Sequence, residues 1–127
     1  MDLPTQTHLT TLRHLLEHRQ RELLSEVGAA QQRQRDATQA EAHEVEDRKD
    51  EAAQQQTEVV DDQQAQRDLD ELAQVQTALR RLDEGRYGDC LACGEPIELQ
   101  RLLVQPAALR CAACQSRLEE AGRGRRA

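Results

Sequence analysis

The chain has 127 residues, of which 24 are Asp or Glu and 17 are Lys or Arg, so its formal net charge is −7. Its aromatic content is one tyrosine, and its hydrophobic residues, 37% of the total, are mostly Ala and Leu. This composition excludes a large central core and favours long helices. It also excludes aromatic stacking on single-stranded nucleic acid, and the acidic balance disfavours duplex binding, so we expect no direct sequence-specific DNA binding.

The N-terminal residues, from Met1 to Thr5, lack the apolar run of roughly 7–15 residues that a secretory signal contains. No apolar stretch elsewhere approaches the roughly 18 residues that span a bilayer. We therefore expect a cytoplasmic protein with no membrane partner. In that reducing compartment the four cysteines are predicted to be metal ligands or redox thiols rather than disulfides.

Apolar residues recur at helical spacing near the N-terminus, several of them at intervals of seven. They are Leu9, Leu12, Leu16, Leu23, Val27, Ala30, Ala37 and Ala40. This heptad pattern predicts a long helix that packs against another helix. Thr5 or Thr7 can cap its start, and Gly28 costs about 1 kcal/mol in a helix interior without ending it.

A second set of apolar residues at helical spacing precedes the cysteines. It consists of Ala65, Leu69, Leu72, Val75, Leu79 and Leu82. This helix is predicted to end at about residue 84, because Gly85 suits a left-handed C-terminal cap. The two patterns predict an all-α fold, in which residues 1–85 form a long antiparallel coiled-coil hairpin with its tip near residues 44–52.

Charge is distributed unevenly along the chain. Residues 36–71 contain thirteen acidic and three basic side chains, a local balance of −10. After Gly85 the chain contains seven arginines and five acidic residues, a balance of +2. Residues 122–127 are rich in Gly and Arg and are predicted to form a short flexible basic tail.

The strongest motif is a pair of C-x2-C knuckles, Cys90 with Cys93 and Cys111 with Cys114. This spacing is typical of a tetrahedral zinc site, and it predicts a small four-cysteine zinc-finger head over residues 86–121 with a short C-terminal helix. The head is too small to fold on apolar burial alone, so one structural Zn²⁺ would supply folding energy. The alternative interpretation is a thiol redox switch. The candidates to offset the charge of four thiolates are Arg86, Arg101, Arg110 and Arg117.

One further motif, His14 to His18, matches the H-x-x-E-H pattern of zinc peptidases. It lies within the first heptad pattern and has no evident third ligand, so we interpret it as a polar flank of the helix. No Ser-His-Asp set or Gly-rich phosphate loop is present in the sequence. We therefore expect no catalytic residues and no enzymatic activity.

The segment around the first knuckle resembles the DksA/TraR family of bacterial zinc-finger transcription regulators. The resemblance rests on Leu79 to Ile97, which contains a G-x-Y-G-x-C-x-x-C-G-x-x-I run, on Arg101-Leu102, on Pro106 and on Cys111 to Gln115. Family members also carry a D-x-x-D-x-A motif at the hairpin tip, and Asp47, Asp50 and Ala52 supply it here.

The resemblance implies binding to RNA polymerase. In this interpretation the hairpin enters the secondary channel, the head docks at the rim, and the tip acts near the catalytic centre to alter open-complex lifetime. Composition alone favours a solvated acidic face as the interpretation of Asp47 and Asp50, whereas the resemblance favours a functional role. The other functional hypotheses are a zinc-stabilised coiled-coil adaptor for another protein and a redox-sensing thiol protein.

Two positions depart from the family pattern. In ppGpp-responsive members the residue before the loop proline and the one after the fourth cysteine are basic, whereas this chain has Gln105 and Gln115. We therefore expect weak or absent dependence on ppGpp. We also expect the chain to act as a monomer.

Overall fold

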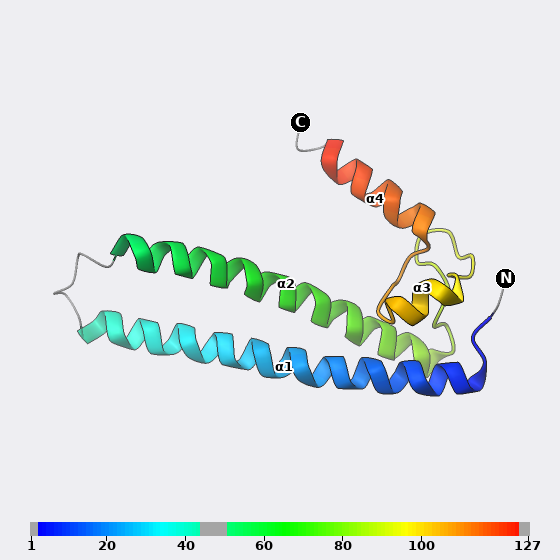
Figure 1. Cartoon of the computed structure of the whole chain (residues 1–127), viewed down its shortest axis with the longest axis horizontal. Helices are drawn as coiled ribbons and strands as arrows, with labels where there is room; N and C mark the ends of the chain where they lie inside the picture. The colour runs from blue at the N-terminus through cyan, green and yellow to red at the C-terminus, as the bar shows by residue number, and fades with distance from the viewer. Residues whose placement is uncertain (1–2, 44–50, 125–127) are drawn as a thin grey trace. The chain divides into compact units, whose positions relative to one another are not determined.

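The computed structural model describes residues 3–43 and 51–124, with side chains over 3–40 and 62–122. It contains the helices α1 (Gln6–His43), α2 (Glu51–Glu84), α3 (Leu99–Val104) and α4 (Ala112–Gly124) (Figure 1). These ranges contain no strand, and their one isolated bridge pairs Asp89 with Pro96. None of the helices described is long and apolar enough to cross a bilayer. The predicted all-α fold is confirmed; α3 was not predicted.

Helix α1 begins at a reciprocal cap built by Thr5 and His8. The backbone N–H of His8 donates to Oγ1 of Thr5 at 3.2 Å, and the backbone N–H of Thr5 donates to Nδ1 of His8 at 3.1 Å. This is the geometry of a capping box in which histidine takes the place of Glu or Gln. The helix then continues through Gly28 without a break, as the sequence predicts.

The chain forms two compact units, of which the first contains Met1–Gln20 and Ala73–Ala127. Here the start of α1 and the end of α2 run antiparallel, and their buried residues are Leu12, Leu16, Val75 and Ala78. An ion pair joins Arg13 Nη1 to Asp83 Oδ1 at 2.9 Å. Because both side chains are well exposed, this pair adds little to the stability that the buried leucines provide.

The second unit, Arg21–Leu72, pairs the remainder of α1 with the remainder of α2. Leu23 and Leu72 are buried, but Val27 and Ala30 are only half-buried and Ala37 is exposed. A groove of about 440 Å³ lies here, and its apolar lining consists of Val27, Ala30, Ala37, Ala65 and Leu69. The predicted heptad pattern therefore forms a closed core only where it carries leucine, because alanine is too short to fill the space between two helices.

The C-terminal end of α2 is fixed by Gly85, which has a φ of +74°. Its N–H donates to Leu82 O at 3.2 Å, and the N–H of Arg86 donates to Arg81 O at 2.8 Å. These two bonds form a Schellman motif, in which glycine avoids the steric cost of the left-handed conformation. The predicted end of the second helix is confirmed.

We expect Leu16→Ala to destabilise the protein by about 2 to 5 kcal/mol, because the side chain is only 1% exposed and its removal leaves a cavity. The matched control is the neighbouring Leu15, which is 47% exposed. Leu15→Ala should cost less than about 1 kcal/mol. Urea unfolding followed by circular dichroism measures both changes, and equal losses would contradict the assigned packing face of α1.

Candidate metal centre

The first knuckle is a tight loop closed by backbone hydrogen bonds. The N–H of Cys90 donates to Glu95 O at 2.8 Å, and the N–H of Gly94 donates back to Cys90 O at 2.9 Å. Gly94 has a φ of +75°, a conformation that glycine adopts without steric cost. This turn brings both thiols of the loop close to the thiols of the second knuckle.

The second knuckle lies at the start of α4. Cys111 directly precedes the helix, and its carbonyl oxygen accepts the N–H of Gln115 at 2.9 Å. Cys114 is three residues further on, so the two thiols share one face of the first helical turn. Two elements of different kind, a loop and a helix start, thus supply the two pairs of cysteines.

The two knuckles are joined by contacts that do not involve sulfur. The N–H of Leu91 donates to Leu109 O at 2.8 Å, and the hydroxyl of Tyr87 donates to Pro106 O at 2.8 Å. Burial raises the pKa of Tyr87 above its usual value, so this hydroxyl keeps its proton and remains a donor. Around these bonds is an apolar cluster of Cys90, Ile97, Leu102 and Cys114, with Tyr87, Ala108 and Cys111 packed against it.

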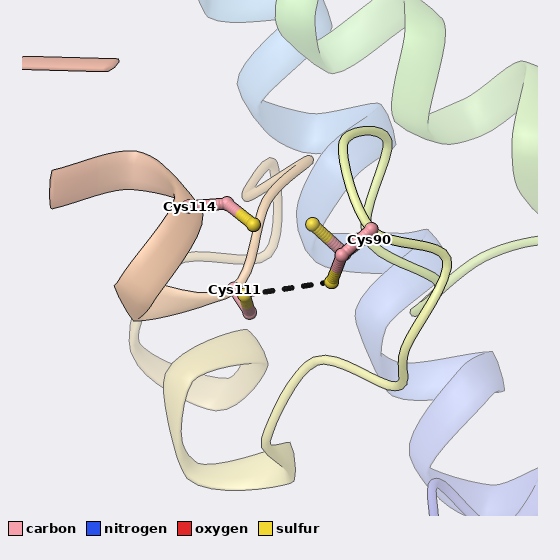
Figure 2. A group of neighbouring side chains, drawn as sticks. Cys90, Cys111 and Cys114 are labelled. Carbon is pink, nitrogen blue, oxygen red and sulfur yellow. Dashed lines mark hydrogen bonds between the residues drawn. The ribbon is translucent and has the colours of Figure 1, made fainter. Parts of the chain in front are cut away.

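The structure brings all four predicted cysteines together. Their Sγ atoms lie within 4.8 Å of one another, and those of Cys93 and Cys111 are 3.9 Å apart. Figure 2 shows Cys90, Cys111 and Cys114 turned toward a common centre. Zn–S bonds of 2.3 Å in a tetrahedron require sulfur separations of about 3.8 Å, so this arrangement fits one Zn²⁺ with little adjustment. Cys90 and Cys114 are buried, whereas Cys93 is exposed.

The thiols influence one another's ionisation. Burial raises the pKa of Cys90, but hydrogen bonds from neighbouring backbone, the strongest from Cys111, outweigh burial and lower that pKa to about 6. Hydrogen bonds with the thiols of Cys111 and Cys90 raise the pKa of Cys114 to about 12. A second thiolate is thus disfavoured beside the first. A bound dication reverses this preference and displaces the remaining protons.

The other predicted site residues lie elsewhere. His14 and His18 are exposed on α1, and among the described side chains the four cysteines are the one group of three or more metal-ligating residues that come together. Asp47 and Asp50 lie outside the described residues, and Ala52 belongs to the first turn of α2.

Four arginines are candidates to offset the charge of the thiolates, and two of them form a hydrogen bond or an ion pair with another residue of the head or of the end of α2. Arg86 forms an ion pair with Glu84, and Arg101 donates to the carbonyl oxygen of Arg110. Sequence reasoning missed Arg81, which donates to the carbonyl oxygen of Arg86 at the end of the glycine cap and to that of Asp89 directly before Cys90. Its position in the last turn of α2, just before the glycine cap, was the available signal.

The head of this chain is similar to known proteins. Residues 85–120 match the family model of the prokaryotic dksA/traR C4-type zinc finger. A segment of 48 residues is 42% identical to the "RNA polymerase-binding transcription factor DksA" of two strains of Caulobacter vibrioides, covering 38% of this chain and 34% of the relative. The match thus spans about a third of the length of these relatives. The zinc-finger match and the geometry of the cysteines together identify one structural zinc site.

Similarity to solved structures extends over more of the chain. Transcription factor DksA2 from Pseudomonas aeruginosa superposes with a TM-score of 0.72 and 29% identity, covering 93% of this chain and 88% of that protein. The RNA polymerase binding protein and transcriptional regulator Dks from Chlamydia trachomatis gives a TM-score of 0.55 at 19% identity, covering 92% and 93%. The second likeness concerns the fold alone.

We expect protein purified without oxygen to contain one Zn²⁺ per chain by elemental analysis. Cys111→Ser should remove most of this zinc and loosen the head, because three thiolates hold the ion less tightly than four. Much of the helical circular dichroism should survive, since α1 and α2 bury leucines independently of the metal. Loss of all helicity in this variant would contradict the independence of the two parts.

Proposed function

We propose that this chain, which belongs to the DksA/TraR family of C4-type zinc-finger proteins, binds bacterial RNA polymerase in the cytoplasm and regulates transcription without catalysing a reaction. The observation that carries the proposal is the likeness to transcription factor DksA2 over 93% of the chain, which includes the paired helices as well as the head. The name of the Caulobacter relative supplies the partner, RNA polymerase.

In this proposal the zinc is structural. Cys90, Cys93, Cys111 and Cys114 hold it through four thiolates, which leave no open position for water or substrate. The head then presents a fixed surface to the rim of the polymerase secondary channel, and the hairpin enters the channel. The tip residues Asp47, Asp50 and Ala52 act near the catalytic centre. Helix α1 ends at His43 and helix α2 begins at Glu51, so the described parts of the two helices lie on either side of Asp47 and Asp50 in the sequence.

A pull-down with core RNA polymerase tests the proposal against its main alternative, an adaptor for another protein. Retention of the full chain by the core enzyme, with loss of retention after Cys111→Ser, is the expected result. A chain that carries zinc but is not retained by polymerase would favour the adaptor. Full retention of a chain that zinc chelation has depleted of metal would show that the head is not the docking surface.

Neutralising the tip should separate binding from regulation. Asp47→Asn and Asp50→Asn preserve shape and remove charge, and a tip inside a channel offers little contact area, so polymerase affinity should change by less than about 1 kcal/mol. The change in open-complex lifetime should be mostly abolished, because the charge acts on the surroundings of the catalytic Mg²⁺. Binding and promoter-complex decay are measured on the same variants.

The matched control for the tip is Asp70→Asn on α2. Asp70 is exposed and accepts a hydrogen bond from Gln66, which asparagine can also accept. This variant should regulate as the unaltered protein does. Unchanged regulation by the doubly neutralised tip would instead assign Asp47 and Asp50 to a solvated acidic face.

We also expect little dependence of regulation on ppGpp. Capture of this polyanion relies on charged donors, whereas the amide of Gln115 already donates to Glu119 Oε1 at 3.2 Å and Gln105 brings no charge. Transcription assays with and without ppGpp measure the effect, and Gln105→Arg combined with Gln115→Lys should increase it. Strong enhancement by ppGpp that disappears in Gln115→Ala would contradict this argument.

A further inference from the structure

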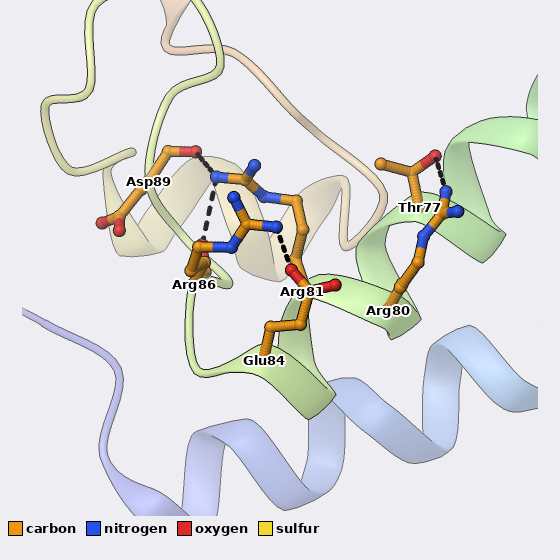
Figure 3. Close-up of polar contacts among 6 residues, drawn as sticks. All are labelled: Thr77, Arg80, Arg81, Glu84, Arg86 and Asp89. Atoms are coloured by element: carbon orange, nitrogen blue, oxygen red, sulfur yellow. Dashed lines mark hydrogen bonds and ion pairs between the residues drawn. The ribbon is translucent and has the colours of Figure 1, made fainter.

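An arginine from α2 holds the peptide unit that carries the first cysteine of the first knuckle. Arg81 Nη2 donates to the carbonyl oxygen of Asp89 at 2.8 Å, and Asp89 directly precedes Cys90. The same nitrogen donates to Arg86 O at 3.2 Å, at the end of the glycine cap (Figure 3). One guanidinium therefore ties the end of α2 to the entry of the first knuckle.

A second arginine does the same at the second knuckle. Arg101, in α3, donates Nε to the carbonyl oxygen of Arg110 at 3.0 Å, and Arg110 directly precedes Cys111. The side chain of Arg101 is partly buried. The two C-x2-C pairs thus share a contact that their spacing does not predict. In both, the carbonyl oxygen of the residue before the first cysteine accepts a hydrogen bond from an arginine side chain.

We propose that Arg81 and Arg101 are positioning residues that set the directions of the thiolates toward the metal. A peptide unit is planar, so fixing its carbonyl oxygen also fixes the N–H and the Cα of the next residue. Each arginine therefore orients the Cα–Cβ bond of the cysteine that opens its knuckle, Cys90 or Cys111. The proposal rests on zinc binding by the four cysteines and does not depend on the polymerase.

Arginine suits this position because its planar fork reaches a carbonyl in a defined direction and remains charged. The alternative explanation is that any positive charge near four thiolates helps. Arg80 offers a matched control, since it is the neighbour of Arg81 on the same helix and donates to Thr77 Oγ1 at 3.2 Å (Figure 3). Lysine at position 81 or 101 keeps the charge and loses the fork.

The test uses the full chain loaded with Co²⁺, whose d–d absorption bands report ligand directions, followed by transfer of bound Zn²⁺ to a competing chelator. Arg81→Gln and Arg101→Gln should each weaken metal binding roughly 10- to 100-fold, the usual effect of removing a residue that orients a ligand. Both should also shift the Co²⁺ bands. Arg80→Gln should leave affinity and spectrum unchanged, and Arg81→Lys and Arg101→Lys should behave like the Gln variants.

Several results would overturn the proposal. Lysine variants with the affinity of the unaltered protein would make charge the cause, and weakened binding with an unchanged Co²⁺ spectrum would mean general loosening of the head. If a Gln variant does not fold, its Lys counterpart supplies the spectrum. A chain of unaltered sequence that binds no Co²⁺ would overturn the zinc assignment together with this proposal, whereas polymerase binding does not enter any of these measurements.

Discussion

The head depends on one constraint, that its metal site and its apolar core share three cysteines. Three of the seven residues in the cluster are the cysteines Cys90, Cys111 and Cys114, and the large side chains that accompany them are Ile97, Leu102 and Tyr87. So few apolar groups do not offset the conformational entropy of ordering this segment. Four thiols within 4.8 Å also resist joint ionisation unless a cation lies among them. Zinc held by these cysteines would therefore link the loop of the first knuckle to the start of α4.

The paired helices obey a different constraint, the size of the side chains between them. Leucines close the space in the first unit, where Leu12 and Leu16 are fully buried, and in the second unit Leu23 is also fully buried. The same positions further along α1 are alanines. The groove of about 440 Å³ lies where these alanines do not fill the space between the two helices. Burial decreases along the second unit, so local opening should require least energy in its alanine-rich part. The helices there are maintained mainly by the propensities of Ala, Gln and Glu.

The sequence predicted the features that short-range chemistry determines. Gly85 has the left-handed conformation expected of it, because a helix cap constrains that one residue locally. The four cysteines lie together as expected, because C-x2-C spacing is itself typical of a tetrahedral metal site. Helix α3 escaped prediction, because six residues without a side-chain cap carry no periodic signal. Arg81 escaped because its partners lie five and eight residues away in a loop whose path only the folded head defines. Asp68 likewise reads as a surface residue, yet it is buried and accepts a hydrogen bond from Gln64.

The distribution of charge restricts how such a chain can act on a nucleic-acid enzyme. A stretch with a balance of −10 over residues 36–71 is repelled by phosphate backbones, so the hairpin gains no affinity from DNA or RNA. Contacts that hold it must be made with protein surfaces, and the less acidic head is the part best able to make them. An acidic segment held in place by contacts elsewhere can influence a cationic centre through its charge. This division matches the proposed function, in which the head supplies affinity while the acidic stretch supplies the effect.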